Sequence, residues 1–96
     1  MRPVAEIMFC DFVGVCMDQI TNHAAKQRYM SGGATHVPMT VRMIAGGGIG
    51  GFGAQHSQST EATLLHIPGL KIVYPSTPTE AKGLLLSCIF DDDPCI

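Results

Sequence analysis

The chain has 96 residues, a hydrophobic fraction of 46%, a charged fraction of only 15% and a formal net charge of −2. This length allows one domain at most, near the lower end of what buries a self-sufficient core. The six basic residues are scattered and no apolar run approaches the ~20 residues that span a bilayer, so we expect neither nucleic acid nor a membrane as a partner.

Strand and helix patterns alternate along the first half of the chain. Residues 3–9 predict a buried strand interrupted by Glu6, and residues 12–30 place apolar side chains at helical spacing. Gly32 and Gly33 end this helix. The apolar run over 37–45 then predicts a second strand.

The most informative segment follows at 45–58, with the sequence AGGGIGGFGAQHSQ. Six of the eight residues in 46–53 are glycine, and glycine accepts a positive φ that brings backbone close to a ligand or to another chain. We predict a short helix over 57–66, whose first N–H groups would point back at the loop. A ligand or a partner is therefore expected there, with His56 facing it.

The second half continues the alternation. Pro68 and Gly69 close the short helix, residues 70–74 predict a third strand, and a capping-box pattern at 77–80 opens a helix that runs to about residue 90. An acidic turn at 91–94 leads into a new strand that begins at Cys95. The pattern predicts an α/β fold, a parallel sheet with helices on both faces, in which the segments 3–9, 37–44 and 70–74 are neighbours or near neighbours and the helix over 12–30 covers one face.

The four cysteines fall in two distant pairs with no C-x-x-C spacing. A disulfide framework is typical of small loop-rich secreted folds, whereas this chain has long periodic apolar segments. We therefore predict free and mostly buried thiols. The histidines show no spacing, with each other or with the cysteines, that is typical of a zinc site.

Five sequence blocks carry a family resemblance. They are RPVAEIMFCDF at 2–12, DQITNHAAKQRYMSGG at 18–33, GAQHSQS at 53–59, HIPGLKIVYPSTPTEAKGLL at 66–85 and DDDPCI at 91–96. With these blocks in family order, the chain resembles the β subunit of the thiamin-diphosphate-dependent first component of 2-oxo-acid dehydrogenase complexes, especially of the acetoin and pyruvate dehydrogenase type. The resemblance implies that residues 1–96 form part of a transketolase-like pyrimidine-binding domain that lacks its N-terminal part and is followed in the family by a C-terminal domain.

The resemblance also implies roles for three residues in an oxidoreductase. Phe12 would pack against the aminopyrimidine ring of thiamin diphosphate, and Met8 would line the same pocket; the alternative is that both are ordinary core residues. His56 would line the active-site channel and handle protons during acyl transfer to lipoamide, a role that suits a group whose pKa lies near neutrality. The alternative for His56 is a loop histidine satisfied by neighbouring backbone.

Other parts of the family's site lie outside this chain. In the family, the glutamate that activates thiamin lies upstream, and Glu6 matches a different position. The diphosphate and its magnesium are held by the partner α subunit. The implied partners are an α subunit in a heterotetramer, a second β subunit and a lipoyl-bearing acyltransferase, in the bacterial cytoplasm or in the mitochondrial matrix of a eukaryote. We expect the isolated chain to be inactive.

Some family members also bind potassium near the second strand and the end of the last helix. The matching positions here are Met39, Thr40, Cys88, Asp91 and Asp93. Carbonyl and carboxylate oxygens suit a hard cation. The alternative is that a helix simply ends in an acidic turn.

Two other functions stay open from the sequence. The pattern G-x-G-x-x-G occurs twice, starting at Gly46 and at Gly48, which is typical of dinucleotide-binding loops. Such a site also needs an acidic residue at the end of the next strand, and that strand ends in VYP without a carboxylate. The other alternative is a non-catalytic structural fragment. The substrate (acetoin, pyruvate or a branched-chain 2-oxo acid) also stays open.

Overall fold

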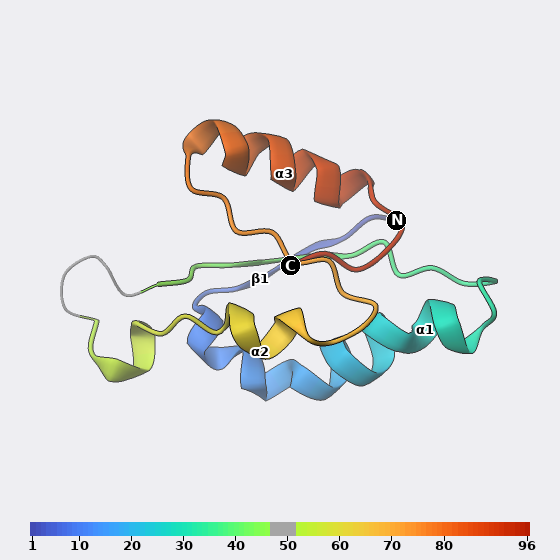
Figure 1. The fold of residues 1–96 in the computed structure, drawn as a ribbon, viewed down its shortest axis with the longest axis horizontal. Helices are drawn as coiled ribbons and strands as arrows, with labels where there is room; N and C mark the ends of the chain where they lie inside the picture. The colour runs from blue at the N-terminus through green and yellow to red at the C-terminus, as the bar shows by residue number, and fades with distance from the viewer. Residues whose placement is uncertain (47–51) are drawn as a thin grey trace.

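A parallel sheet forms the centre of the computed structural model, which describes residues 1–46 and 52–96 (Figure 1). Strands β1 (Val4–Ile7) and β2 (Thr40–Met43) pair in parallel, with Val4 opposite Thr40. The predicted ligand loop at 46–53 lies partly outside the described residues.

Two further segments extend the sheet beyond β2. Cys95 makes parallel bridges to Thr40 on one side and to Lys71 on the other. The Val41 N–H donates to the Cys95 carbonyl at 2.8 Å, and the Val73 N–H donates to the Ile96 carbonyl at 2.8 Å. Across the sheet the order is therefore β1, β2, 95–96 and 71–73, all parallel. The predicted segments 37–44 and 70–74 are near neighbours, separated by the segment at 95–96.

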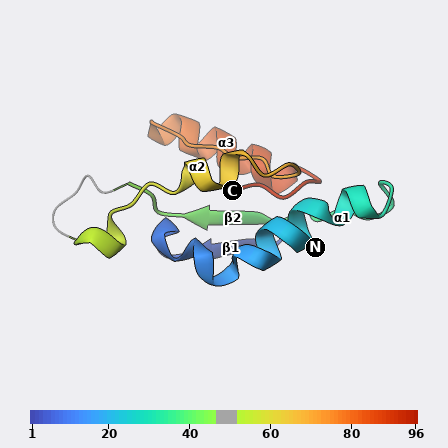
Figure 2. The same ribbon diagram turned by 60° about the horizontal axis from the view of Figure 1, so that its bottom comes forward.

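This order explains which helices cover which face. From β1 to β2, and from β2 to residues 71–73, the chain moves in one direction across the sheet, and it then moves back to reach 95–96. Right-handed crossovers place the first two connections on one face and the last on the opposite face. Figures 1 and 2 show α1 (Ala25–Met30) and α2 (Glu61–Leu65) on one side of the sheet and α3 (Pro78–Phe90) on the other. The prediction of helices on both faces is confirmed.

The predicted helix over 12–30 exists, but it is not a uniform α-helix. It begins as the 3₁₀-helix η1 (Cys10–Cys16), continues as the π-helix η2 (Gln19–Ala24) and ends as α1. The Thr21 hydroxyl donates to the Met17 carbonyl at 2.9 Å, a bond that competes with the regular backbone pattern. Gly32 and Gly33, with φ of 62° and 87°, follow the end of α1, as predicted.

Two predicted elements have different boundaries in the structure. The second strand starts at Thr40 rather than at residue 37, because Pro38 has no N–H and the Met39 N–H turns back to the Val37 carbonyl at 2.8 Å. The predicted helix start at residue 57 is wrong. A short 3₁₀-helix, η3 (Ala54–His56), precedes an extended stretch, and α2 begins only at Glu61. The expectation that a helix N-terminus at residue 57 faces the glycine loop is therefore wrong as well.

Helix α3 begins where the capping pattern predicts. The Thr77 hydroxyl accepts a hydrogen bond from the Glu80 N–H at 3.2 Å. The Glu80 carboxylate reaches Ser76 rather than the N-cap residue, and it accepts from the Ser76 hydroxyl at 2.7 Å and from the Ser76 N–H at 2.9 Å. These bonds, with that of the Ser76 hydroxyl first, lower the pKa of Glu80 below its ordinary value.

The core lies between the sheet and the face that carries α1 and α2. Val13, Ile20 and Leu64 are buried there. Side chains from the sheet side pack against them, namely Ile7, Met43, Ile72 and Ile96. In the described parts of the chain, none of the helices has the length and apolar character needed to cross a membrane.

The cysteines are free thiols, as predicted. Cys10, Cys88 and Cys95 are buried, and Cys16 is half-buried. Burial, with a smaller contribution from the neighbouring Cys88, raises the pKa of the Cys95 thiol to about 12. Cys95 is therefore an inert core residue at neutral pH rather than a nucleophile.

Candidate functional site

The carboxyl ends of β1 and β2 meet at one edge of the sheet. After β1 the chain continues through Met8 and Phe9 into η1, and after β2 it continues into the glycine-rich loop that returns through η3. The Cys10 N–H donates to the Ile44 carbonyl at 2.8 Å and joins the two exits. Ligand sites of open parallel sheets lie at this edge, so the candidate site is built from these two connections.

Four rings gather at this edge and are called the aromatic cluster here: Phe9, Phe12, Phe52 and His56. The centroid of the His56 ring lies 5.1 Å from that of Phe9, at an interplanar angle of 83°, and 5.1 Å from that of Phe12, at 70°. Phe9 and Phe52 lie 5.9 Å apart. Aromatic rings prefer such edge-to-face arrangements. The structure therefore brings together Phe12 and His56, which the sequence analysis assigned to one site.

The cluster is open to solvent on the side of the predicted ligand. The Phe12 side chain is 42% exposed and that of Met8, directly before Phe9, is 68% exposed, so neither is a buried core residue in this structure. His56 is half-buried. An exposed aromatic face beside an imidazole is the kind of surface on which a flat heteroaromatic ring can pack.

The loop that carries His56 is attached to η1 at Gln58. The Gln58 N–H donates to Asp11 Oδ1 at 2.9 Å, and the Gln58 carbonyl accepts from the Gly46 N–H at 3.0 Å. Partial burial raises the pKa of Asp11, but hydrogen bonds from the backbone N–H groups of Gln58 and of Asp11 itself, with the Gln58 side chain and the nearby His56, outweigh it and lower the pKa. The bond from Gly46 also opposes a helix start at residue 57, since the Gln58 carbonyl would otherwise accept from the N–H four residues later.

The residues predicted to bind a cation have other partners. Both carboxylate oxygens of Asp91 lie 2.7 Å from Lys71 Nζ, and Asp93 Oδ1 lies 2.7 Å from an Arg28 guanidinium nitrogen. Lys71 holds the pKa of Asp91 below its ordinary value, and Arg28 does the same for Asp93. The Met39 carbonyl accepts from the Cys95 N–H at 3.0 Å.

The carboxylates of the predicted potassium site are therefore paired with Lys71 and Arg28 in this structure. Over residues 1–46 and 52–96, no group of three His, Cys, Asp or Glu side chains is arranged to hold a metal ion. Thr40 and Cys88 are both buried. A potassium ion at this place would depend on carbonyl oxygens, and its binding stays a prediction.

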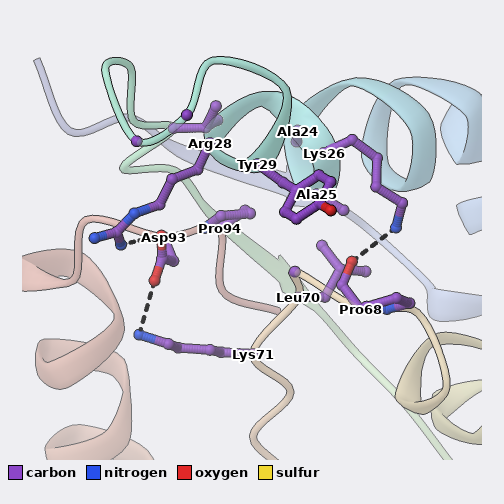
Figure 3. Close-up of a pocket in the computed structure, with 14 residues that line it drawn as sticks. Ala24, Ala25, Lys26, Arg28, Tyr29, Pro68, Leu70, Lys71, Asp93 and Pro94 are labelled. Carbon is purple, nitrogen blue, oxygen red and sulfur yellow. Dashed lines mark hydrogen bonds and ion pairs between the residues drawn. The ribbon is translucent and has the colours of Figure 1, made fainter.

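A cavity of about 980 Å³, which no sequence pattern predicted, lies at the opposite edge of the sheet (Figure 3). It lies between α1 and the amino ends of the segments at 71–73 and 95–96. Asp93 joins Arg28 and Lys71 on one wall, and Lys26 Nζ donates to the Pro68 carbonyl at 2.7 Å on the other. Since these charged groups already have partners, the aromatic cluster is the better candidate site.

Comparisons with known proteins agree with each other. The family model described as the pyrimidine-binding domain of transketolase matches residues 1–96. The β subunit of acetoin:2,6-dichlorophenolindophenol oxidoreductase from Cupriavidus necator is 55% identical over 96 residues, which are 100% of this chain and 28% of the relative. The subunit of the same name from Bacillus subtilis is 55% identical over 94 residues, 98% of this chain and 27% of the relative.

A relative with a different name is almost as similar. The β subunit of 2-oxoisovalerate dehydrogenase from Pseudomonas aeruginosa is 54% identical over 96 residues, 100% of this chain and 27% of the relative. The chain thus spans 27–28% of the length of these relatives.

Proposed function

Because this chain belongs to the transketolase pyrimidine-binding domain family, we propose that it supplies part of the wall that holds the aminopyrimidine ring of thiamin diphosphate in the β subunit of a 2-oxo-acid dehydrogenase. The observation that carries the proposal is the exposed Phe12 ring, edge-to-face with His56, at the carboxyl edge of the sheet. The relatives are named as β subunits of acetoin and 2-oxoisovalerate oxidoreductases. The reaction class is oxidative cleavage or decarboxylation with acyl transfer to lipoamide.

Phe12, Met8 and His56 have different roles in the proposed site. Thiamin diphosphate, when bound, supplies the carbanion chemistry. Phe12 and Met8 cover one side of its pyrimidine ring and exclude water from it. His56, beside Phe12, gives and takes a proton during acyl transfer, a role that histidine side chains commonly have in enzymes.

The rest of the site comes from other chains and segments. In the proposed assembly a partner α subunit holds the diphosphate and magnesium. The proposed assembly is a heterotetramer with a second β subunit, and it delivers acyl groups to a lipoyl-bearing acyltransferase. Relatives occur in bacteria and in mitochondria, which suggests the bacterial cytoplasm or the mitochondrial matrix.

A dinucleotide-binding function has less support. Helix α2 begins at Glu61, well after the last glycine of the loop at Gly53, whereas a dinucleotide loop leads directly into its helix. The segment at 71–73 ends without a carboxylate to hold a ribose. A non-catalytic structural role applies at most to the isolated chain.

The test replaces Phe12 by alanine in the complete β subunit, assembled with its α subunit. Because an aromatic ring that stacks on a base contributes about 1–3 kcal/mol, thiamin diphosphate affinity should fall roughly 10-fold or more. Calorimetric titration of the cofactor measures this. Phe90→Ala, on the exposed end of α3 at the opposite face, is the control and should leave affinity unchanged. Unchanged affinity in a correctly assembled Phe12→Ala protein contradicts the proposal.

A further inference from the structure

We propose that Asp11 is a positioning residue for His56, because its carboxylate fixes the loop that carries the imidazole to the segment that carries Phe12. The inference rests on the proposed role of His56 and adds a residue that neither the sequence analysis nor the comparisons assign to the site.

The geometry makes Asp11 a short link between the two functional side chains. Asp11 directly precedes Phe12 in η1, and its Oδ1 accepts from the N–H of Gln58, two residues after His56, at 2.9 Å. A residue spans at most about 3.3–3.6 Å of extended chain, so this bond holds the backbone of His56 within about 7 Å of Gln58 at the surface of η1. The imidazole and Phe12 rings, which lie 5.1 Å apart, are both close to this bond in the chain.

The neighbouring bonds show why the fold does not depend on Asp11. The Gln58 carbonyl is held by the Gly46 N–H at 3.0 Å and by the Cys10 thiol at 3.3 Å. The Thr60 hydroxyl donates to the Cys10 carbonyl at 3.3 Å. These bonds keep the base of the loop on η1, whereas Asp11 alone supplies a side-chain acceptor for the Gln58 N–H.

The charge of Asp11 adds to this restraint. An ionised carboxylate accepts stronger hydrogen bonds than a neutral amide oxygen does. It also attracts the His56 ring whenever that ring is protonated, and the lowered pKa of Asp11 includes this attraction. The carboxylate therefore favours one position of the loop during each proton transfer.

Three variants of the assembled enzyme test the inference. Asp11→Ala removes the acceptor, and Asp11→Asn keeps a neutral acceptor of the same shape. Asp18→Ala is the matched control, because this exposed carboxylate lies on the same helical segment and has its polar contacts with Asn22, Gln19 and His23. The readouts are amide hydrogen exchange of the peptide over 55–60, which does not depend on activity, and turnover.

We expect Asp11→Ala to speed amide exchange over 55–60 and to slow turnover by about 10- to 100-fold, as misplacement of a reacting group by about 1 Å does. Asp11→Asn should restore the exchange protection and most of the turnover. Asp18→Ala should change neither. Because Asp11 acts through His56, adding Asp11→Ala to His56→Ala should slow turnover no further.

Several outcomes overturn the inference. One is that Asp11→Ala shows the amide exchange and turnover of the wild type. Another is that Asp11→Ala slows turnover by the same factor in the wild-type and in the His56→Ala background. The third is that both Asp11→Ala and Asp11→Asn lose assembly. If His56→Ala itself turns over normally, the proposed function of His56 fails instead. The exchange of the 55–60 peptide in Asp11→Ala still decides whether Asp11 holds the loop.

Discussion

Replacement of His56 by alanine is expected to slow turnover of the assembled enzyme by about 100-fold or more, the usual contribution of a positioned proton-transfer group. The fold should stay nearly intact, because His56 is half-buried in η3 and outside the core of Val13, Ile20 and Leu64. Thiamin diphosphate affinity should change far less than turnover does. Phe12 and the partner subunit supply most of that contact in the proposed site.

Turnover in the reconstituted complex and cofactor titration measure the two effects separately. His66→Ala is the matched control, since this exposed histidine follows α2 and its ring lies 3.4 Å from the Ala62 carbonyl. Normal turnover of His56→Ala would make His56 a structural residue. Loss of assembly would place it at a subunit interface.

Gly69→Ala is expected to destabilise the protein by about 3 kcal/mol or more, from backbone strain and overpacking together. Gly69 has a φ of 99°, which L-residues rarely adopt. A Cβ at this position would lie 1.9 Å from the Ala25 carbonyl oxygen, so α1 would have to move. The turn at 68–70 therefore packs directly against the helix backbone, and only glycine fits between them.

Gly33→Ala separates the two causes. Gly33 has a similar φ of 87°, but a Cβ there would meet nothing within 4 Å. This variant should cost only the strain, about 1 kcal/mol. Chemical denaturation of both variants gives the comparison. If Gly69→Ala unfolds at the same denaturant concentration as Gly33→Ala, the close approach of a Cβ at residue 69 to the Ala25 carbonyl does not destabilise the protein, and the prediction is wrong.

Local signals account for what the sequence predicted well. Helix α3 starts as expected because Thr77, Pro78 and Glu80 act within the same first turn. The parallel sheet with helices on both faces followed from the alternation of strand and helix patterns together with the handedness of crossovers. The prediction that Phe12 and His56 belong to one site was based on the family resemblance and not on their spacing in the sequence.

Long-range contacts account for what the sequence did not predict. The late start of α2 goes with the bond from the Gly46 N–H to the Gln58 carbonyl, between residues far apart in the chain. Phe9 is the last residue before η1 and had the pattern of a strand core residue, although its ring lies beside His56. The family resemblance assigned Asp91 to a potassium site, and it could not show that the Asp91 carboxylate pairs with Lys71.

The position of the cofactor in the assembled enzyme tests the account most directly. A crystal structure of the complete β subunit with its α subunit and thiamin diphosphate should show the aminopyrimidine ring against Phe12, with the His56 ring facing the same pocket. A pyrimidine ring bound elsewhere, for example in the cavity between α1 and the segments at 71–73 and 95–96, with Phe12 covered by another protein segment, would contradict it.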